Sequence, residues 1–308
     1  MSKFSIVIAV FNKAEFIKNT IQSVLNQTIQ EFELVIVNDG STDGSESAIL
    51  AFKDDRIHYV SQSNKGASAA RNVGIQQASN PYIAFLDADD KWLPDHLETI
   101  QKLMNEVPGE KVFATNSLIL RNNKQFGKSY SVSFSRGSNV VNYFQASLLD
   151  SILHSSTLVA HADVFKQVGM YDHELESGED TDLYVRIGVA YQVVFNPKVC
   201  VHIQQTQNSL MLATQTIAQK PDFKKYEALE ASNIHLKKYL DQNRYSLCIL
   251  AKRTGDHKAY NENLKKIDFD NLNKKQQQLL KLPGSLIRTL LKFKKLAERF
   301  GIRPVIRK

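Results

Sequence analysis

The first ninety residues alternate short apolar runs with helical patterns, and this alternation restricts the fold more than any other feature. The apolar runs have the length and composition of buried strands, and they occupy residues 4–10, 32–37, 57–60 and 82–86. Helical patterns lie between them, at residues 67–78 and along an apolar stripe of Ile17, Ile21, Val24 and Leu25. Strands joined through helices favour right-handed crossovers. We therefore predict an α/β fold with a mostly parallel sheet and helices on both faces.

The fourth apolar run leads directly into three carboxylates, Asp87, Asp89 and Asp90. They should emerge at the carboxyl edge of the sheet, where the ligand sites of open α/β sheets lie. Carboxylates at alternate positions supply hard oxygen ligands for Mg²⁺ or Mn²⁺, and such an ion is usually shared with substrate phosphates. The pattern predicts a metal-held diphosphate. The alternative is a polar turn before a helix opened by Leu93 and Pro94, with Asp90 as its cap.

A second polar cluster, Asn-Asp-Gly-Ser-Thr-Asp-Gly, follows the second apolar run at residues 38–44. Asp39 lies just beyond this strand and could accept a hydrogen bond from the ring N–H of a uracil in a mostly apolar pocket. A glycine turn in which Ser41, Thr42 or Asp43 caps the next helix explains most of the cluster, but it does not require Asp39.

A third cluster, at residues 64–72, combines a glycine and small side chains with cations. Gly66 and its small neighbours let a helix start pack closely against the sheet. Helix N-termini attract phosphate, and Arg71 lies one turn inside this helix, so it could face a base or a diphosphate. The alternative is a solvated basic helix.

The charge is divided unevenly along the chain, although the total is only +7. Residues 1–209 contain 17 Lys and Arg against 23 Asp and Glu, whereas residues 210–308 contain 22 against 9. The basic excess belongs to the C-terminal third. It indicates an anionic partner, a membrane surface and a nucleic acid being the usual ones.

Length and cysteine content limit the class of protein. A chain of 308 residues that is 43% hydrophobic can bury the core of one large domain and carry an appendage. The apolar run at residues 4–11 is too short to span a bilayer and lacks a cleavage site, so we predict a strand rather than a signal peptide. Cys200 and Cys248 support neither a disulfide scaffold nor a thiolate zinc site, and a reducing cytoplasm fits them.

Several blocks of sequence recur together in one known family. They lie, in order, at residues 4–12, 23–28, 37–43, 66–74, 85–90, 155–159 and 169–172. In these blocks the chain resembles the family 2 glycosyltransferases of GT-A fold. The resemblance implies a mixed sheet of GT-A type, a nucleotide-diphosphosugar donor that is most often a UDP-sugar, and inversion at the anomeric carbon.

The resemblance also implies roles for individual residues. The positions that match the base pocket of the family are Ala9, Phe11, Asp39 and Arg71. Asp87 would face the ribose or the waters of a metal ion, and Asp89 would ligate that ion. Ala9 departs from the family, which usually has proline there. This departure could loosen the first loop, but it removes no chemical group.

The acidic segment around Glu179 supplies candidates for an acid–base catalyst. A structural explanation exists, because Ser177 and Asp180 resemble a capping box and Asp182 with Arg186 makes an i,i+4 ion pair. The resemblance implies that the catalytic base lies in a Glu-Asp pair matching Glu179 and Asp180. We assign Asp180 as the base, and Glu179 as a contact to the acceptor or a support of the base.

His202 matches a position where the family often carries a histidine near the donor phosphates. With Asp89 we expect it to hold Mn²⁺ or Mg²⁺, which would stabilise the leaving diphosphate as a Lewis acid and template. The alternative is a partly buried strand histidine. In a single displacement, Asp180 would accept the proton of the acceptor hydroxyl.

The C-terminal third has helical periodicity and no chemical cluster. We predict a catalytic domain at residues 1–215 and a basic helical region at residues 216–308, in which residues 285–300 form an amphipathic helix. Its apolar side carries Leu286, Ile287, Leu290, Phe293, Ala297 and Phe300, and its basic side carries Arg288, Lys292, Lys295 and Arg299. Such a helix can lie in the headgroup region of an anionic leaflet. The alternative is a helix docked on the catalytic domain with a basic outer face.

We therefore predict a metal-dependent, non-processive glycosyltransferase that transfers a single sugar to a glycan, with a lipid-linked acceptor in surface polysaccharide synthesis. It would work in the cytoplasm, at the inner face of the membrane. Processive synthases of the family carry membrane spans and a Gln-X-X-Arg-Trp motif, whereas the sole tryptophan here is Trp92.

Two other functions compete with this prediction. A nucleotidyltransferase would need a strongly basic, glycine-rich first loop. A nucleic-acid-binding protein would place aromatic residues among the cations of the tail, but Phe293 and Phe300 both fall on the apolar side. We therefore expect no nucleic-acid partner.

Overall fold

The computed structural model describes residues 4–122, 124–175, 177–205 and 220–299. The chain divides into two compact units, Met1–Ser209 and Leu210–Lys308, which are described separately. This division and the boundary expected at residue 215 both fall within residues 206–219, outside the described residues, so the domain boundary stays a prediction.

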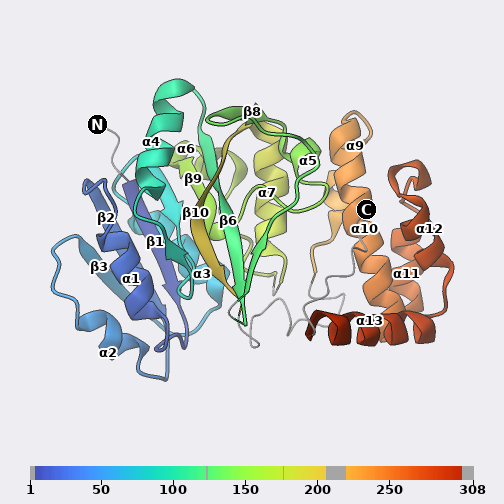
Figure 1. Cartoon of the computed structure of the whole chain (residues 1–308), viewed down its shortest axis with the longest axis horizontal. Coiled ribbons are helices and arrows are strands. Elements are labelled where there is room, and N and C mark those ends of the chain that lie inside the picture. Colours follow the sequence, from blue (N-terminus) through green and yellow to red (C-terminus); the bar gives the residue numbers. More distant parts are fainter. Residues whose placement is uncertain (1–3, 123, 176, 206–219, 300–308) are drawn as a thin grey trace. The chain divides into compact units, whose positions relative to one another are not determined.

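The N-terminal unit is built on a mixed sheet with the strand order β3-β2-β1-β4-β9-β6-β10-β5 (Figure 1). Four parallel strands form one half: β1 (Phe4–Val10), β2 (Phe32–Asp39), β3 (Ile57–Gln62) and β4 (Tyr82–Phe85). The other half contains β9 (Leu158–His161), β6 (Val112–Arg121), β10 (Val193–Gln204) and β5 (Lys91–Trp92). Short strands β7 (Lys124–Gly127) and β8 (Asn139–Val141) pair with β6 and β10. The predicted α/β class is confirmed.

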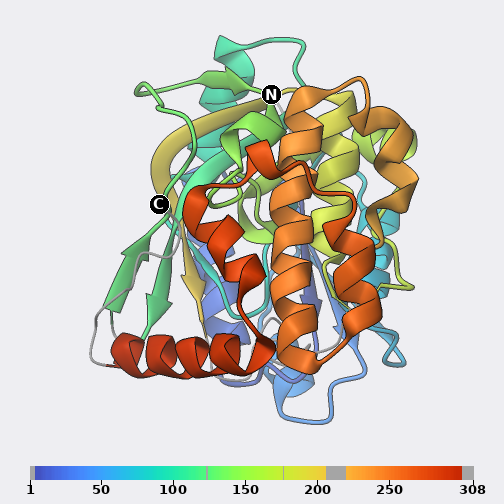
Figure 2. The ribbon, with the colours of Figure 1, turned by 90° about the vertical axis from the view of Figure 1, so that its right-hand side faces the viewer.

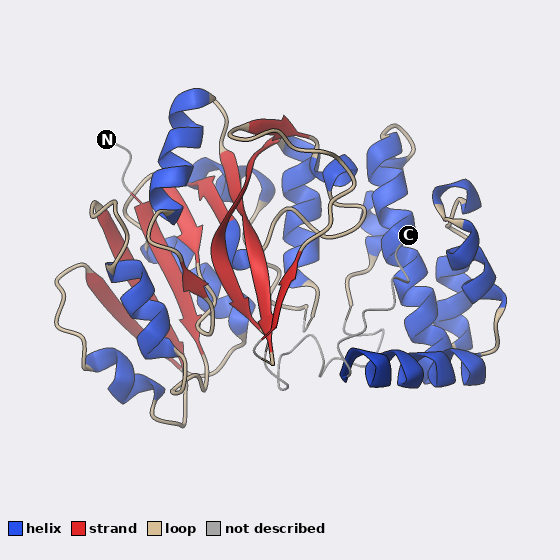
Figure 3. Ribbon diagram, viewed as in Figure 1, coloured by secondary structure: helices blue, strands red, loops and turns tan. Residues whose placement is uncertain are grey.

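Helices cover both faces of this sheet (Figure 3). They are α1 (Ile17–Leu25), α2 (Ser45–Leu50), α3 (Ala67–Gln77), α4 (His96–Glu106), α5 (Tyr143–Ala146), α6 (Ala162–Val168) and α7 (Glu179–Ala190). Helices α1, α2 and α4 pack into one core with alternate residues of β1, such as Ile6 and Ile8. Helix α3 packs on the opposite face, against Val35 and Val37.

Gly74 lets α3 approach β1 closely. A Cβ atom at this position would lie 2.1 Å from Cγ1 of Val7, so only glycine fits here without displacing the strand residue. The contact holds the start of α3, and Arg71 on it, beside the carboxyl ends of β1 and β4. The fold thereby positions the third polar cluster next to the acidic loop that follows β4.

The C-terminal unit contains only helices within the residues described. They are η3 (Phe223–Tyr226), α9 (Glu227–Glu230), α10 (Ile234–Thr254), α11 (His257–Leu264), η4 (Phe269–Asn271), α12 (Lys274–Lys281) and α13 (Gly284–Arg299). A small apolar core of Cys248, Ile267, Leu272 and Leu280 lies against α10. Helix α13 runs across the end of α10 in both Figure 1 and Figure 2.

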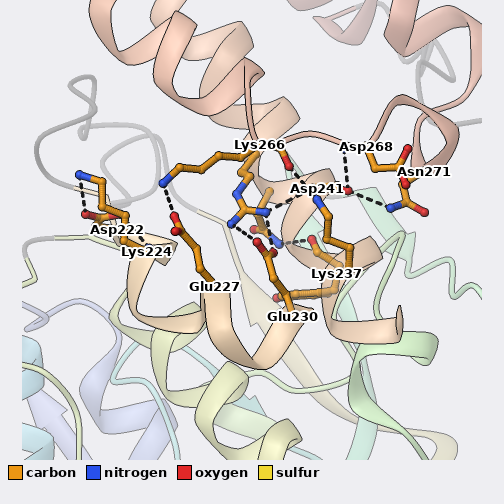
Figure 4. A network of polar contacts seen from close by, with 12 residues as sticks. Asp222, Lys224, Glu227, Glu230, Lys237, Asp241, Lys266, Asp268 and Asn271 are labelled. Carbon is orange, nitrogen blue, oxygen red and sulfur yellow. Dashed lines mark hydrogen bonds and ion pairs between the residues drawn. The ribbon is translucent and has the colours of Figure 1, made fainter. Parts of the chain in front are cut away.

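A buried ionic network stabilises this unit (Figure 4). Arg244 pairs with Glu230 at 2.6 Å and with Asp241 at 3.3 Å. Asp241 also pairs with Lys237 at 2.6 Å and accepts a hydrogen bond from Asn271 at 2.8 Å. Among the described helices, each is too short or too polar to cross a bilayer.

Candidate functional site

The loop after β4 holds its three carboxylates in different environments. Asp87 pairs with Arg71 at 2.8 Å, and Asp89 pairs with the ammonium group of Lys13 at 2.5 Å. Burial is the largest influence and acts to raise the pKa of Asp87, but Arg71, His154 and Lys13 together outweigh it and the pKa is lowered. Asp87 is therefore ionised at neutral pH.

Asp90 is buried and does not cap a helix. Its side chain accepts hydrogen bonds from the hydroxyl of Ser156 at 2.5 Å and the backbone N–H of Gln204 at 2.9 Å. Burial and then the nearby Asp87 raise its pKa well above the ordinary value. The suggestion that Asp90 caps the next helix is wrong, because α4 starts at His96 with Asp95 at the cap position.

Arg71 connects this loop to the start of α7. Its guanidinium lies 3.4 Å from Glu179, 3.7 Å from Asp180 and 5.1 Å from the ring centre of Tyr171, in addition to its contact with Asp87. Only 8% of Arg71 is exposed, so the alternative of a solvated basic helix is wrong for this residue. One buried cation thus gathers carboxylates from two distant segments of the chain.

Asp180 lies in the first turn of α7 and has an unusual proton affinity. Burial raises its pKa to about 7, the charges of Glu179 and Asp87 add to the rise, and Arg71 opposes it. The hydroxyl of Ser155 donates a hydrogen bond to Asp180 at 3.0 Å. A carboxylate with a pKa near neutrality suits general-base catalysis.

The prediction of a capping box at the start of α7 is wrong. The cap position is Gly178, in the left-handed conformation with φ of 84°, and no side chain caps the helix there in the described part of the chain. The expected ion pair between Asp182 and Arg186 is present at 2.9 Å.

The turn η1 (Ser155–Thr157) connects the two acidic segments, and we did not expect this from the sequence. Ser155 bonds Asp180, while the hydroxyl of Ser156 donates to Asp90 and accepts from the backbone N–H of Asp87 at 3.1 Å. Trp92 donates its indole N–H to the carbonyl of Ser156 at 2.8 Å. The sequence signal was the Ser-Ser-Thr block, which shows no specific chemistry by itself.

Asp39 is a fixed hydrogen-bond acceptor at the end of β2. Only 2% of it is exposed, and it accepts bonds from the backbone N–H groups of Lys65 at 2.9 Å and Gly66 at 2.8 Å and from Gln62 at 2.7 Å. The cap position of α2 is Gly44, so the proposed capping by Ser41 or Thr42 is wrong. Asp43 does serve the helix start, because its carboxylate accepts a hydrogen bond from the backbone N–H of Ser45, the first residue of α2, at 2.9 Å.

The first loop, after β1, carries the remaining residues expected in a base pocket. Ala9 packs at the edge of the core under α3, and Phe11 is 45% exposed. The loop is tied to the one after β2, since Asn12 accepts a bond from Thr42 N–H at 2.8 Å. The effect of Ala9 on this loop stays a prediction.

Asp89 and His202 line the same pocket of about 240 Å³. The other lining residues are Glu15, Phe16, Asn19, Lys91, Leu120 and Gln204. Burial, with a contribution from Lys91, lowers the pKa of His202, so its imidazole is neutral at pH 7 and has a lone pair for a metal ion. A carboxylate, an imidazole and space for diphosphate oxygens fit a divalent cation.

A second group, of Asp87, Asp90 and His154, offers ligand atoms within 4.8 Å of one another. It fits an ion less well. Burial raises the pKa of Asp90 well above its ordinary value, which disfavours the charged form that a cation needs, and both its oxygens already accept hydrogen bonds. His154 accepts a bond from Ser156 N–H on Nδ1, so the neutral ring carries its proton on Nε2 and has no free lone pair.

Comparison with known proteins identifies the family and the fold of the chain. The family model of glycosyl transferase family 2 matches residues 5–169. An uncharacterized glycosyltransferase of Rickettsia bellii is 35% identical over 187 residues, or 60% of this chain and 26% of that protein. The putative teichuronic acid biosynthesis glycosyltransferase TuaG of Bacillus subtilis is 40% identical over 105 residues, or 33% of this chain and 42% of TuaG.

The chain spans between 26% and 66% of the length of the first curated relatives that it matches. Among solved structures, residues 1–349 of S. aureus TarS in complex with UDP-GlcNAc superpose with a TM-score of 0.65 at 17% identity, covering 97% of this chain and 92% of that one. This likeness confirms the GT-A type of fold. Since the family model covers more than half of the chain, the chain belongs to glycosyl transferase family 2.

Proposed function

We propose that this protein is an inverting glycosyltransferase that moves a single sugar from a nucleotide-diphosphosugar to a hydroxyl of a glycan. The observation that supports this most is the Arg71 cluster. It holds Asp87, from the acidic loop, and the pair Glu179 and Asp180 around one cation, beside the pocket that contains Asp89. Donor, metal and acceptor groups would then meet at one edge of the sheet.

A UDP-sugar is the proposed donor. The uracil N–H needs an acceptor of fixed position, and the carboxylate of Asp39 is held by bonds to Gln62, Lys65 and Gly66. Ala9, Phe11 and Arg71 would complete the base pocket. TarS, whose fold this chain shares, has been solved with UDP-GlcNAc.

Asp89 and His202 are the proposed metal residues, and Mn²⁺ or Mg²⁺ is the proposed ion. When bound, the ion would neutralise charge on the leaving diphosphate. Lys13 holds Asp89 in the described structure and would have to release it to the ion. Asp87 would contact the ribose or the waters of the ion.

Asp180 is the proposed base. The acceptor oxygen attacks the anomeric carbon on the face opposite the diphosphate, the bond from that carbon to the phosphate oxygen breaks, and Asp180 takes the hydroxyl proton. Its raised pKa supports this role, because a base with a pKa near the working pH transfers protons well. Glu179 would contact the acceptor or support the base.

The proposed acceptor is a lipid-linked glycan of surface polysaccharide synthesis. The relationship to TuaG, a putative teichuronic acid biosynthesis enzyme, supports a polysaccharide. We place the reaction in the cytoplasm, because Cys200 and Cys248 are both free thiols.

Release of UDP from a panel of UDP-sugars tests the assignments. We expect Asp180→Asn to lower kcat by about 100-fold to 10,000-fold, and Asp89→Ala to abolish the stimulation by Mn²⁺. Asp163→Asn is a matched control, because Asp163 is a half-exposed carboxylate of α6 outside the site. Equal turnover by the wild type and both site variants would contradict the proposal.

Calorimetry separates the competing functions. A glycosyltransferase binds UDP more tightly with Mn²⁺ than without it, whereas a nucleic-acid-binding protein binds RNA with a steep dependence on salt. A nucleotidyltransferase would instead consume a nucleoside triphosphate and release pyrophosphate.

A further inference from the structure

Contacts near the start of α13 fix its rotation about its own axis relative to α10. A Cβ atom on Gly284 would lie 2.3 Å from the carbonyl oxygen of Lys252, so the helix touches the backbone of α10. The ammonium group of Lys252 donates hydrogen bonds to the carbonyls of Leu280 and Leu282, just before α13. Ile287 is 3% exposed and packs inward. Contact with α10 therefore determines which face of α13 is free.

The free face carries apolar side chains. Leu286, Leu290 and Phe293 are 42%, 43% and 64% exposed. Their spacing of four and three residues places them on one side of the helix, in a single line that we call the apolar stripe. The sequence pattern places Ile287 on the same side as these residues, but in the structure Ile287 is buried and they are exposed. The stripe lacks a covering partner among the described residues of the C-terminal unit.

The sequence around the stripe is strongly basic. Residues 285–308 contain eight Lys and Arg and one acidic residue. Lys281 and Arg288 are exposed on the described part of the surface. A partner of this surface must accept large apolar side chains and many cations together. Nucleic acid satisfies only the second requirement, whereas an anionic bilayer satisfies both.

We propose that the apolar stripe of α13 binds the surface of an anionic bilayer. Leu286, Leu290 and Phe293 enter the boundary between headgroups and acyl chains, and the surrounding cations contact lipid phosphates. This inference rests on the proposed function in one respect only: membrane binding would bring the enzyme to its lipid-linked acceptor. Membrane binding itself can be measured without any sugar.

Vesicle flotation of the full chain tests this proposal, with phosphatidylcholine vesicles that contain or lack phosphatidylglycerol. We expect binding only with the anionic lipid. The triple variant Leu286→Ser, Leu290→Ser, Phe293→Ser should bind at least about tenfold more weakly, since three apolar side chains lose their burial in the bilayer. The matched control is Leu229→Ser with Ile234→Ser, which changes apolar residues of the same unit that are 43% and 75% exposed.

A fluorescence measurement gives independent evidence. In Phe293→Trp, emission should shift to shorter wavelength on addition of anionic vesicles, while the buried Trp92 of the wild type should show no shift. Unchanged flotation of the triple variant, equal binding to neutral vesicles, or a stripe-dependent oligomer without lipid would each overturn the proposal. UDP calorimetry on the triple variant tests the catalytic unit separately, because retained donor binding with lost flotation leaves the proposed function intact.

Discussion

Asp180 is surrounded by charges of both signs, and their balance sets its proton affinity. Burial raises its pKa to about 7, with Glu179 and Asp87 adding to the rise and Arg71 opposing it. A base must be deprotonated to accept a proton, so turnover should fall as the pH drops below 7. The same residue would be a poor base if it lay in an open, solvated turn with its ordinary pKa.

Glu179→Gln should therefore move the acidic limb of kcat/KM to lower pH. Removal of the carboxylate charge at position 179 lowers the pKa of Asp180, by up to about one pH unit for a neighbouring charge. The pH profile of UDP release measures this shift. Glu106→Gln, at the exposed end of α4, is the control and should leave the limb in place. A limb unaffected by Glu179→Gln would mean that another group controls the profile.

At the proposed metal site, Lys13 would compete with the ion for Asp89. Its ammonium group lies 2.5 Å from the carboxylate, and in Lys13→Met this competition is absent. We expect Mn²⁺ without donor to bind about threefold to tenfold more tightly to this variant, as measured by calorimetry. Lys102→Met removes a comparable exposed ion pair, at 2.6 Å from Glu98, and should have no effect. Weaker Mn²⁺ binding in Lys13→Met would show that the pair prepares Asp89 rather than blocks it.

At the scale of elements, the turn η1 holds together two loops that are far apart in the sequence. Ser156 contacts Asp87 and Asp90, and Ser155 contacts Asp180. These bonds are buried or partly buried, where a lost partner is most costly. The turn thus contributes to the stability of the unit and to the position of Asp180, the proposed base.

Ser156→Ala should lower the free energy of unfolding by about 1–3 kcal/mol, because Asp90 loses a buried hydrogen-bond partner. Urea denaturation measures the change. In the control, Ser135→Ala, the lost hydroxyl is exposed, so a change within about 0.5 kcal/mol is expected. If the two variants have equal free energies of unfolding, the hydrogen bond to Asp90 contributes nothing to stability.

The packing of α3 on β1 leaves no space for a side chain at position 74. Gly74→Ala should destabilise the protein by about 1–3 kcal/mol, because the added methyl group would lie 2.1 Å from Val7. Thermal unfolding compares it with Gly127→Ala, where no atom lies within 4 Å. A Gly74→Ala protein as stable as the control would mean that α3 shifts at little cost.

At the scale of the whole chain, the C-terminal unit depends on its own buried charges. Arg244→Met would leave Glu230 without this cation and Asp241 with Lys237 alone, and it should destabilise this unit by about 3–5 kcal/mol. Hydrogen exchange should increase in α10 and stay unchanged in β1, with UDP binding retained. Arg253→Met, at an exposed position of the same helix, is the control. Equal exchange in both variants would contradict this role of the network.

Local patterns were sufficient to predict much of the fold. Strand β1 and the start of α3 follow the periodicity of their own residues, and the edge where Asp39 and Asp87 emerge follows from parallel strands. The role of Asp90 could not be predicted in this way. Its burial depends on Ser156, 66 positions away, so a local helix cap looked equally plausible in the sequence.

Other contacts could not be predicted from the sequence, because they join residues that are far apart in the chain and carry no recognisable motif. The contact between Lys13 and Asp89 joins the loops after β1 and β4, and neither residue type indicates the other. The periodicity of residues 285–300 predicted an apolar face, but the contacts of α10 with Gly284 decide that Ile287 is buried and Leu286 is free. The expected Ala297 lies where no side chain is described, and Phe300 lies outside the described residues.

The position of Arg71 between two acidic segments has a consequence for how substrates influence each other. One guanidinium shares its attraction among Asp87, the proposed donor contact, and Glu179 and Asp180, the proposed acceptor contact and base. An acceptor alcohol that draws Glu179 away would leave more of that attraction for Asp87, and a ribose that engages Asp87 would leave more of it for Asp180. In the proposed reaction, binding of the donor and binding of the acceptor would therefore be coupled through this single guanidinium.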